Sequence, residues 1–504
     1  MNDNKTVRTR VAPSPTGAPH IGTAYIALFN YAFAKKNGGQ FILRIEDTDQ
    51  TRSTIESETE IFNALQWVGI NADESPATGG EKGPYRQSER TDIYREHCNI
   101  LIENEKAYPC FCSSERLTEL RKEQLAAKEM VGYDGLCAKL SKEEAQKRIN
   151  NCEPHVIRMR VPESGDCIFN DRLRGEISIP WTQVDQQVLM KSDGFPTYHL
   201  ANVVDDHLME ISHVIRGEEW INSTPKHVLL YQHFGWDIPE FIHLPLLRNP
   251  DQSKLSKRKN PTSILYYQRA GYLPQAVLNY LGLMGYSMPD GSEIFTLKKF
   301  IENFDIDRIS LGGPIFDLQK LANFNGQYLR ELTTDSLLDE LKTWNLNDET
   351  WKQVLPLAQP RLKTLADLMP MATFLFTDKL EYDAEMLLSN VIDAERATRL
   401  LKIAQWELET ITNWNTDIIQ ATIGRISEKE DIKIKKLLAL FFVAITGKKV
   451  SLPLFDSMLL LGRDLVLRRI NYALEALAAA GTALSGKKLK KLQKEYNSTY
   501  GNFS

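Results

Sequence analysis

Two short segments of the chain carry side chains that suit phosphate chemistry. The first is a turn rich in proline and glycine, residues 13–23, which holds His20 and Gly22 just ahead of a helical pattern. A glycine lets a phosphate approach the backbone, and the free N–H groups at the start of a helix attract anions. A histidine donor at such a turn can stabilise charge that builds up on a reacting phosphate.

The second segment is Lys254-Leu255-Ser256-Lys257-Arg258. Two lysines three residues apart can reach a polyphosphate as mobile point charges, although the pentapeptide alone is better explained as an ordinary basic loop. The pair of segments, in this order and roughly 230 residues apart, favours a nucleotide site. The chain has no Walker lysine loop, Gly-x-Gly-x-x-Gly or His-Glu-x-x-His motif, so P-loop, dehydrogenase and zincin functions lose support.

The elements around the first turn predict a parallel sheet. Residues 7–11 form a short apolar run, residues 21–36 repeat alanine and leucine with helical spacing, and residues 41–45 read as a buried strand. Strand, helix and strand at this spacing make a βαβ unit. Ligands bind at the carboxyl ends of such strands, which is where the turn lies.

The rest of the chain divides by pattern. Residues 188–247 form a second region of this kind, with apolar segments at 200–204 and 211–215 and a helix near 225–234. All six cysteines lie between residues 98 and 167, in a stretch that looks like an insertion between the two halves. After about residue 330 the chain shows long amphipathic helical segments, such as 337–344, 361–376 and 464–480.

Composition excludes several protein classes. The 504 residues are 42% hydrophobic and 25% charged, which excludes a disordered or collagen-like chain and suggests about three or four domains. The longest apolar run, residues 437–445, is too short to span a membrane and is expected to be core. The first residues contain no apolar signal segment. We expect a soluble cytoplasmic protein without a membrane partner.

Charge is distributed unevenly. From Asp431 onward there are thirteen basic and five acidic residues, a net charge of +8 in a chain whose total is −5. A basic end on an acidic body favours a polyanionic partner such as a nucleic acid, although a solvated lysine-rich helix face is an equal alternative.

On these residues the chain resembles the class I aminoacyl-tRNA synthetases and, within them, the bacterial glutamyl-tRNA synthetases. His20-Ile21-Gly22-Thr23 stands in the place of the HIGH signature, and residues 254–258 stand in the place of KMSKS, with Leu255 and Arg258 as departures. The resemblance covers essentially the whole chain, and its most specific stretches are residues 9–23, 42–51, 83–90, 191–207 and 245–258.

The resemblance implies an α/β fold followed by an all-α region. A Rossmann-type, doubly wound parallel sheet would form the catalytic domain and carry an inserted acceptor-end-binding domain; an anticodon-binding region would follow. The implied boundaries are residues 1–105 and 188–255 for the two catalytic halves, 106–187 for the insertion, 256–328 for a stem-contact domain and 329–504 for the helical region.

The implied reaction is ATP-dependent ligation of L-glutamate to tRNA(Glu) through a glutamyl-adenylate, with release of AMP and pyrophosphate. ATP would come with Mg²⁺, and His20, Gly22, Lys254 and Lys257 would bind it, with His20, Lys254 and Lys257 as catalytic residues. The residues that match the family's glutamate pocket are Arg10, Ala12, Ser14, Glu46, Tyr198, Asn202 and Arg216. An arginine fork suits the substrate's side-chain carboxylate, and Glu46 suits its ammonium group. A structural Glu46–Arg216 ion pair is the alternative.

Three cysteines and a tyrosine match positions where some family members bind structural Zn²⁺: Cys110, Cys112, Tyr133 and Cys137. Lys139 stands in the place of the usual histidine ligand and cannot bind a metal, so Tyr133 would supply the fourth ligand of a tetrahedral site. Members without zinc also exist, and three packed thiols are the alternative.

Several alternatives stay open. Arg361 is a candidate tRNA contact, with an ordinary helix-face arginine as the alternative. The sequence does not tell whether tRNA(Gln) is also charged or which residues read the anticodon, and only the family suggests a monomer. Rival functions are a glutaminyl enzyme, a tRNA-modifying paralogue, a small-molecule nucleotidyltransferase and a catalytically inert tRNA-binding relative.

Overall fold

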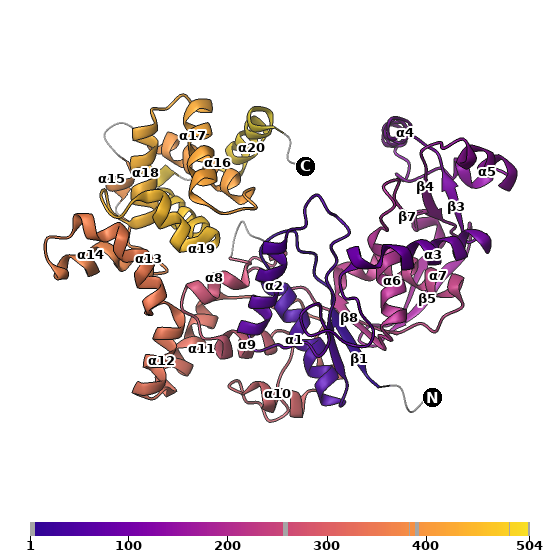
Figure 1. The fold of residues 1–504 in the computed structure, drawn as a ribbon, viewed down its shortest axis with the longest axis horizontal. Coiled ribbons are helices and arrows are strands. Elements are labelled where there is room, and N and C mark those ends of the chain that lie inside the picture. Colours follow the sequence, from indigo (N-terminus) through magenta and orange to yellow (C-terminus); the bar gives the residue numbers. More distant parts are fainter. Residues whose placement is uncertain (1–5, 256–260, 383, 389–392, 483, 502–504) are drawn as a thin grey trace. The chain divides into compact units, whose positions relative to one another are not determined.

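A computed structural model describes residues 6–255, 261–382, 384–388, 393–482 and 484–501 (Figure 1). The chain divides into two compact units. Unit 1 comprises Met1–Leu255 and Leu278–Leu318, and unit 2 comprises Ser256–Val277 and Gln319–Ser504. The segment 256–328 predicted as one domain is therefore shared between the units. The predicted domain boundaries themselves stay predictions.

Unit 1 contains all nine strands found in the described residues. They are β1 (Arg8–Val11), β2 (Gln40–Leu43), β3 (Ala107–Cys110), β4 (Val156–Met159), β5 (Asp166–Asp171), β6 (Gly175–Pro180), β7 (Val188–Met190), β8 (His213–Gly217) and β9 (Glu240–Leu244). Its helices are α1 (Ile21–Lys36), α2 (Ile55–Trp67), α3 (Thr91–Glu103), α4 (Ser114–Ala127), α5 (Lys142–Asn150), α6 (Tyr198–Leu208), α7 (Thr224–Phe234) and α10 (Leu297–Asn303).

The predicted βαβ unit is present with nearly the predicted bounds. β1 pairs in parallel with β2, and α1 connects them. The side chain of His20 caps α1 by accepting a hydrogen bond from the backbone N–H of Gly22 at 2.9 Å. A side chain on Gly39 would collide with the backbone of Val7, so glycine is required for the chain to turn back into β2.

The second half of the sheet is mixed rather than purely parallel. Its strand order is β6-β5-β9-β8, with β9 parallel to both β5 and β8. β6 runs antiparallel to β5, because a three-residue turn is too short for the crossover that a parallel pair needs. The Ser212 N–H donates to the Arg8 carbonyl at 3.0 Å, which joins the start of β8 to β1. The apolar segment 200–204 lies in α6.

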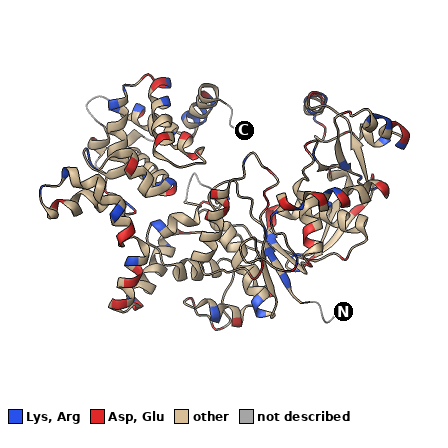
Figure 2. Ribbon diagram, in the orientation of Figure 1, with Lys and Arg blue, Asp and Glu red and all other residues tan. Residues whose placement is uncertain are grey.

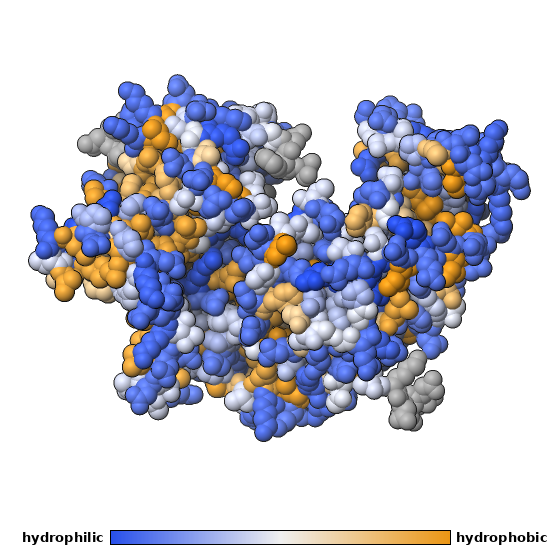
Figure 3. Space-filling view, viewed as in Figure 1, coloured by the Kyte–Doolittle hydropathy of each residue, from blue (hydrophilic) through white to orange (hydrophobic). Residues whose placement is uncertain are grey.

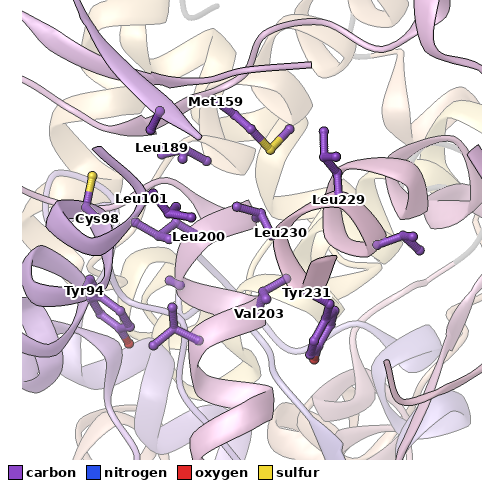
Figure 4. Close-up of a cluster of buried hydrophobic side chains, with 14 of the residues drawn as sticks. Tyr94, Cys98, Leu101, Met159, Leu189, Leu200, Val203, Leu229, Leu230 and Tyr231 are labelled. Atoms are coloured by element: carbon purple, nitrogen blue, oxygen red, sulfur yellow. The ribbon is translucent and has the colours of Figure 1, made fainter. Parts of the chain in front are cut away.

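A buried apolar cluster connects the insertion to this sheet region. Tyr94 and Leu101 of α3 pack with Leu200 of α6 and with Met159 and Leu189 of β4 and β7 (Figure 4). Within the predicted insertion, β3 and β4 form an antiparallel sheet with β7, whereas β5, which carries Cys167, and β6 belong to the mixed sheet. Every residue of α4 and α5 is exposed or half-buried, and their part of the surface is largely hydrophilic (Figure 3).

Unit 2 is helical in its described residues. Its helices are α8 (Ile264–Arg269), α12 (Thr334–Trp344), α13 (Asp348–Ala358), α14 (Leu368–Ala372), α15 (Ala384–Leu387), α16 (Ala394–Glu409), α17 (Thr416–Lys429), α18 (Ile434–Thr446), α19 (Leu454–Leu477) and α20 (Gly486–Tyr500). Helices α9 (Pro274–Gly282) and α11 (Leu318–Glu331) cross the boundaries between the units. Leu437, Phe441 and Ile445 of α18 are fully buried, as expected for the apolar run 437–445.

The prediction of one helical segment over residues 361–376 is wrong. Three short pieces, 365–367, α14 and 373–376, replace it. The break lies at residues 362–364, where Leu362 and Thr364 are extended and Thr364 forms a capping box with Asp367. Pro370 lies in the first turn of α14, where its missing N–H costs no helical hydrogen bond. None of the helices in the described residues is long and apolar enough to cross a membrane.

Candidate active site

The carboxyl ends of β1, β8 and β9 surround a pocket of about 430 Å³ in unit 1. This is the edge of the sheet that the sequence predicts. Nine predicted glutamate and ATP residues line it: Arg10, Ala12, His20, Gly22, Glu46, Tyr198, Asn202, Arg216 and Lys254. Ser14 is exposed and does not line this pocket, and its role stays a prediction.

The predicted phosphate turn meets the pocket at the N-terminus of α1. The bond from Gly22 N–H to His20 Nδ1 fixes the imidazole against the first turn of the helix. A Cβ on Gly22 would lie 2.9 Å from His20 Nδ1, so glycine keeps this contact possible. The helix N-terminus and the imidazole therefore face the same space.

The second predicted segment reaches the pocket through Lys254. Its backbone pairs with Arg248, and its carbonyl accepts a hydrogen bond from the Asn249 amide at 2.9 Å. Lys257, predicted as a catalytic residue, lies outside the described residues together with Arg258.

Arg10 is a buried arginine on β1 that is paired with a carboxylate. Its Nε and Nη2 each donate at 3.0 Å to the two carboxylate oxygens of Asp206 on α6. Burial opposes the charged form of Arg10, but the Asp206 carboxylate outweighs it and the pKa of Arg10 is raised. Asp206 also accepts from Arg44 at 2.7 Å.

Glu46 lies in the same ionic network, and the structure shows its partners. Its carboxylate is 3.4 Å from Arg44 Nη2 and from the Asn202 amide nitrogen. Burial raises the pKa of Glu46, with Arg44 acting in the opposite direction. The alternative of a Glu46–Arg216 ion pair is not seen among these contacts.

Arg216, at the end of β8, has a different environment. Its guanidinium donates to His243 Nε2 at 3.0 Å, to His227 Nδ1 at 3.1 Å and to the Thr224 hydroxyl at 2.8 Å. Among the described residues no carboxylate forms an ion pair with it. Burial lowers the pKa of Arg216, and Tyr198 beside it acts in the opposite direction. Burial also raises the pKa of Tyr198, to about 12.

The residues that hold the two arginines were not singled out from the sequence. They are Asp206 for Arg10, and Thr224, His227 and His243 for Arg216; Arg44 shares Asp206 and lies 3.6 Å from Asp205. Some signal was present: Asp205 and Asp206 belong to the specific stretch 191–207, and His243 is a polar residue among the buried apolar positions of β9.

The predicted metal ligands come together in the insertion. The three sulfur atoms of Cys110, Cys112 and Cys137 lie within 4.8 Å of one another. The Tyr133 hydroxyl is 3.4 Å from Cys110 Sγ and 3.6 Å from Cys112 Sγ. Three thiols and a phenol at these separations fit a tetrahedral Zn²⁺ site, because sulfur atoms bound to one zinc ion lie just under 4 Å apart.

The predicted RNA-binding features lie in unit 2. Arg361 is exposed and donates to the Leu357 carbonyl at 2.9 Å. The basic residues of α20 are partly paired, since Lys488 contacts Glu395 at 2.9 Å and Lys491 lies 3.8 Å from Glu495 (Figure 2).

Comparisons with known proteins decide the family. The family model for the catalytic domain of class I tRNA synthetases for E and Q matches residues 6–323, and an anticodon-binding domain model matches residues 333–474. The chain is 53% identical to a glutamate–tRNA ligase of Psychrobacter cryohalolentis, over 98% of this chain and 96% of the relative. The chain belongs to the glutamate–tRNA ligases of class I.

Two further relatives agree. A glutamate–tRNA ligase of Pseudomonas fluorescens is 51% identical over 98% of this chain and 99% of its own length. A solved glutamate–tRNA ligase of Elizabethkingia meningosepticum, in complex with its amino acid, is 34% identical with a TM-score of 0.65, covering 94% of this chain and all of the other. The α/β catalytic fold and the helical anticodon-binding region are therefore those predicted.

Proposed function

We propose that this chain ligates L-glutamate to tRNA(Glu) in two steps, with ATP as the energy source. The observation that carries the proposal is the single pocket in which Glu46 and Arg216 meet His20 and Lys254. An acid, an arginine fork and phosphate-binding groups within one space match the charges of glutamate and ATP. Membership of the glutamate–tRNA ligases supports the same reaction.

In the first step the α-carboxylate of glutamate attacks the α-phosphate of ATP and pyrophosphate leaves. Arg216 binds the substrate's side-chain carboxylate, and Glu46 accepts from its ammonium group. His20 and the N-terminus of α1 hold the phosphates, and Lys254 with Lys257 neutralises charge that develops on them. Mg²⁺ would bind the phosphate oxygens with few protein ligands, as it usually does.

In the second step the terminal adenosine of the tRNA attacks the acyl carbon through its 2′-hydroxyl, and AMP leaves. The protein forms no covalent intermediate, so its contribution is orientation and charge stabilisation. Unit 2 supplies the anticodon-binding region that the family model matches, with Arg361 and the basic segment after residue 431 as candidate phosphate contacts.

We assign Cys110, Cys112, Cys137 and Tyr133 to a structural Zn²⁺ site. The metal would crosslink β3 to the segment 133–137 by binding three thiolates and a phenolate. The chemistry of the donor set and its clustering support this assignment. A monomeric state and a cytoplasmic location stay predictions.

The test is aminoacylation of purified tRNA(Glu) and tRNA(Gln) with labelled glutamate, with zinc measured on the same sample. We expect ATP-dependent charging of tRNA(Glu) and about one zinc per chain. Charging of tRNA(Gln) at a comparable rate would show a non-discriminating enzyme. No charging of either tRNA would contradict the proposal, and a preparation that charges tRNA but holds no zinc would contradict the zinc assignment alone.

A further inference from the structure

The pocket contains two buried arginines whose surroundings differ in charge. Arg10 shares both oxygens of the Asp206 carboxylate. Arg216 donates to three side chains, the Thr224 hydroxyl, the His227 imidazole and the His243 imidazole, and Tyr198 lies beside it. The side chains of Thr224, His227 and His243 are fully or almost fully buried, and Arg216 itself is 5% exposed.

The hydrogen-bond network around Arg216 fixes both imidazoles as neutral acceptors. His243 Nδ1 lies 2.7 Å from the Asp171 carboxylate and therefore carries the proton, which leaves the Nε2 lone pair for Arg216. His227 Nε2 lies 3.0 Å from His199 Nδ1, and its Nδ1 accepts from Arg216. Burial lowers the pKa of His243 to about 4 and also lowers the pKa of His227, so neither adds a cation here.

The remaining acceptor is uncharged as well. The Thr224 hydroxyl lies 3.0 Å from the Trp220 carbonyl, to which it donates, so its oxygen is free to accept from Arg216. The carboxylate of Asp171 is separated from Arg216 by the His243 ring, and Asp206 acts on Arg216 through space. The Asp171 oxygens also accept backbone N–H groups of Leu173, Arg174 and His243.

We infer that Thr224, His227 and His243 are positioning residues that orient Arg216 without neutralising it, and that this arrangement sets the preference for an anionic over an amide side chain. Three neutral acceptors use one N–H of each guanidinium nitrogen and fix the plane of the group. Among the described residues no carboxylate bonds to this guanidinium, so a substrate carboxylate supplies the missing anionic partner and a neutral amide cannot.

The inference rests on the proposed function and deepens it. It distinguishes the two arginines by their partners: Arg10 is paired with the Asp206 carboxylate, whereas Arg216 donates to neutral side chains. Asp171 acts one step further away, because it fixes the tautomer of His243.

A matched pair of variants at Thr224 tests the inference. Thr224→Asp puts a carboxylate on Arg216, whereas Thr224→Asn keeps a neutral carbonyl oxygen in nearly the same volume. Thr224 is the first residue of α7, where an acidic side chain is compatible with the helix dipole. The measurement is glutamate KM and glutamine inhibition in the tRNA-charging assay, with ATP KM alongside.

We expect Thr224→Asp to raise the glutamate KM ~100-fold, the scale of a lost buried charge contact, with ATP KM and glutamine inhibition changed by less than about threefold. Thr224→Asn should raise the glutamate KM less than about fivefold. Equal effects of the two variants, or equal losses for glutamate and glutamine, would overturn the inference. Wild-type charging of tRNA(Glu) in the same assay tests the proposed function separately.

Histidine ¹⁵N chemical shifts of the wild-type protein give a second, independent test that needs no variant to fold. At pH 7 we expect His243 to carry its proton on Nδ1 and His227 on Nε2. A doubly protonated ring at either position, or the opposite tautomer of His243, would overturn the inference.

Discussion

The two sides of the pocket give their buried arginines different partners: carboxylates on one side and uncharged acceptors on the other. On the β1–α6 side, Arg10 and Arg44 share Asp206, and Arg44 lies 3.6 Å from Asp205, which also pairs with Arg90 at 2.7 Å. On the side formed by β8, β9 and α7, Arg216 donates its hydrogen bonds within the described residues to uncharged acceptors only. We call the first side the paired wall and the second side the neutral wall. We therefore expect Arg216, which has no bonded carboxylate among the described residues, to be the arginine that is ready to bind an anion.

Removing the shared carboxylate of the paired wall should have the largest effect on stability. Asp206→Asn leaves two buried guanidinium groups without their shared carboxylate, so we expect the free energy of unfolding of unit 1 to fall by about 3–5 kcal/mol. Urea denaturation followed by tryptophan fluorescence measures it. A loss below about 1 kcal/mol would show that Asp206 is not the compensating charge.

Removing the arginine of the neutral wall should affect catalysis more than stability. Arg216→Gln removes the uncompensated charge, so kcat/KM for glutamate should fall by about 10²- to 10³-fold. The free energy of unfolding should fall by less than half as much as in Asp206→Asn, because a desolvated cation disappears with the lost hydrogen bonds. A variant that is strongly destabilised yet still active would reverse the roles of the two walls.

The neutral wall also predicts how stability depends on pH. Burial lowers the pKa of His243 from 6.5 to about 4. As the pH falls through this range, the unfolded chain therefore binds a proton at His243 and the folded chain does not. This contribution to stability is complete above pH 6.5 and is lost between pH 6.5 and about 4.

His243→Gln removes this one titrating group. Below pH 6.5 the slope of unfolding free energy against pH should become shallower by up to about 1.4 kcal/mol per pH unit. Denaturation series between pH 7 and 5 measure the slope. A slope equal to that of the wild type would mean that His243 is not kept neutral by the fold.

We expect the smallest effect on stability from breaking an exposed ion pair, which serves as a control for the buried ones. Arg95 and Asp92 are 2.7 Å apart on α3, but their side chains are 58% and 94% exposed. Solvent screens such pairs, so Asp92→Asn should leave the denaturation midpoint within experimental error of the wild type. A shift as large as that of Asp206→Asn would show that burial does not set the strength of these pairs.

The strand–helix–strand start of the chain could be predicted from local pattern. The apolar period of residues 21–36 and the glycines at 38 and 39 specify α1 and its end almost to the residue. The same reasoning failed over residues 361–376, where the extended residues Leu362 and Thr364 interrupt an apparently helical pattern. Apolar spacing reports which face is buried, but it does not show where a capping box, here Thr364 with Asp367, starts a new helical piece.

The residues of the candidate site could be predicted from the sequence, but their hydrogen-bond and ion-pair partners could not. The resemblance points to Arg10, Glu46 and Arg216, and all three line the pocket. Which arginine is compensated depends on Asp206, 196 residues from Arg10, and on His243, 27 residues from Arg216. Tertiary pairing at such separations leaves no local pattern in the sequence, and Lys257 lies outside the described residues.

The most direct test of the whole account is a crystal structure with a non-hydrolysable glutamyl-adenylate analogue. The account predicts that the analogue's side-chain carboxylate contacts Arg216, its ammonium group contacts Glu46, and its phosphate position lies beside His20 at the N-terminus of α1. An analogue bound elsewhere, or a carboxylate held by Arg10 with Arg216 out of reach, would contradict it.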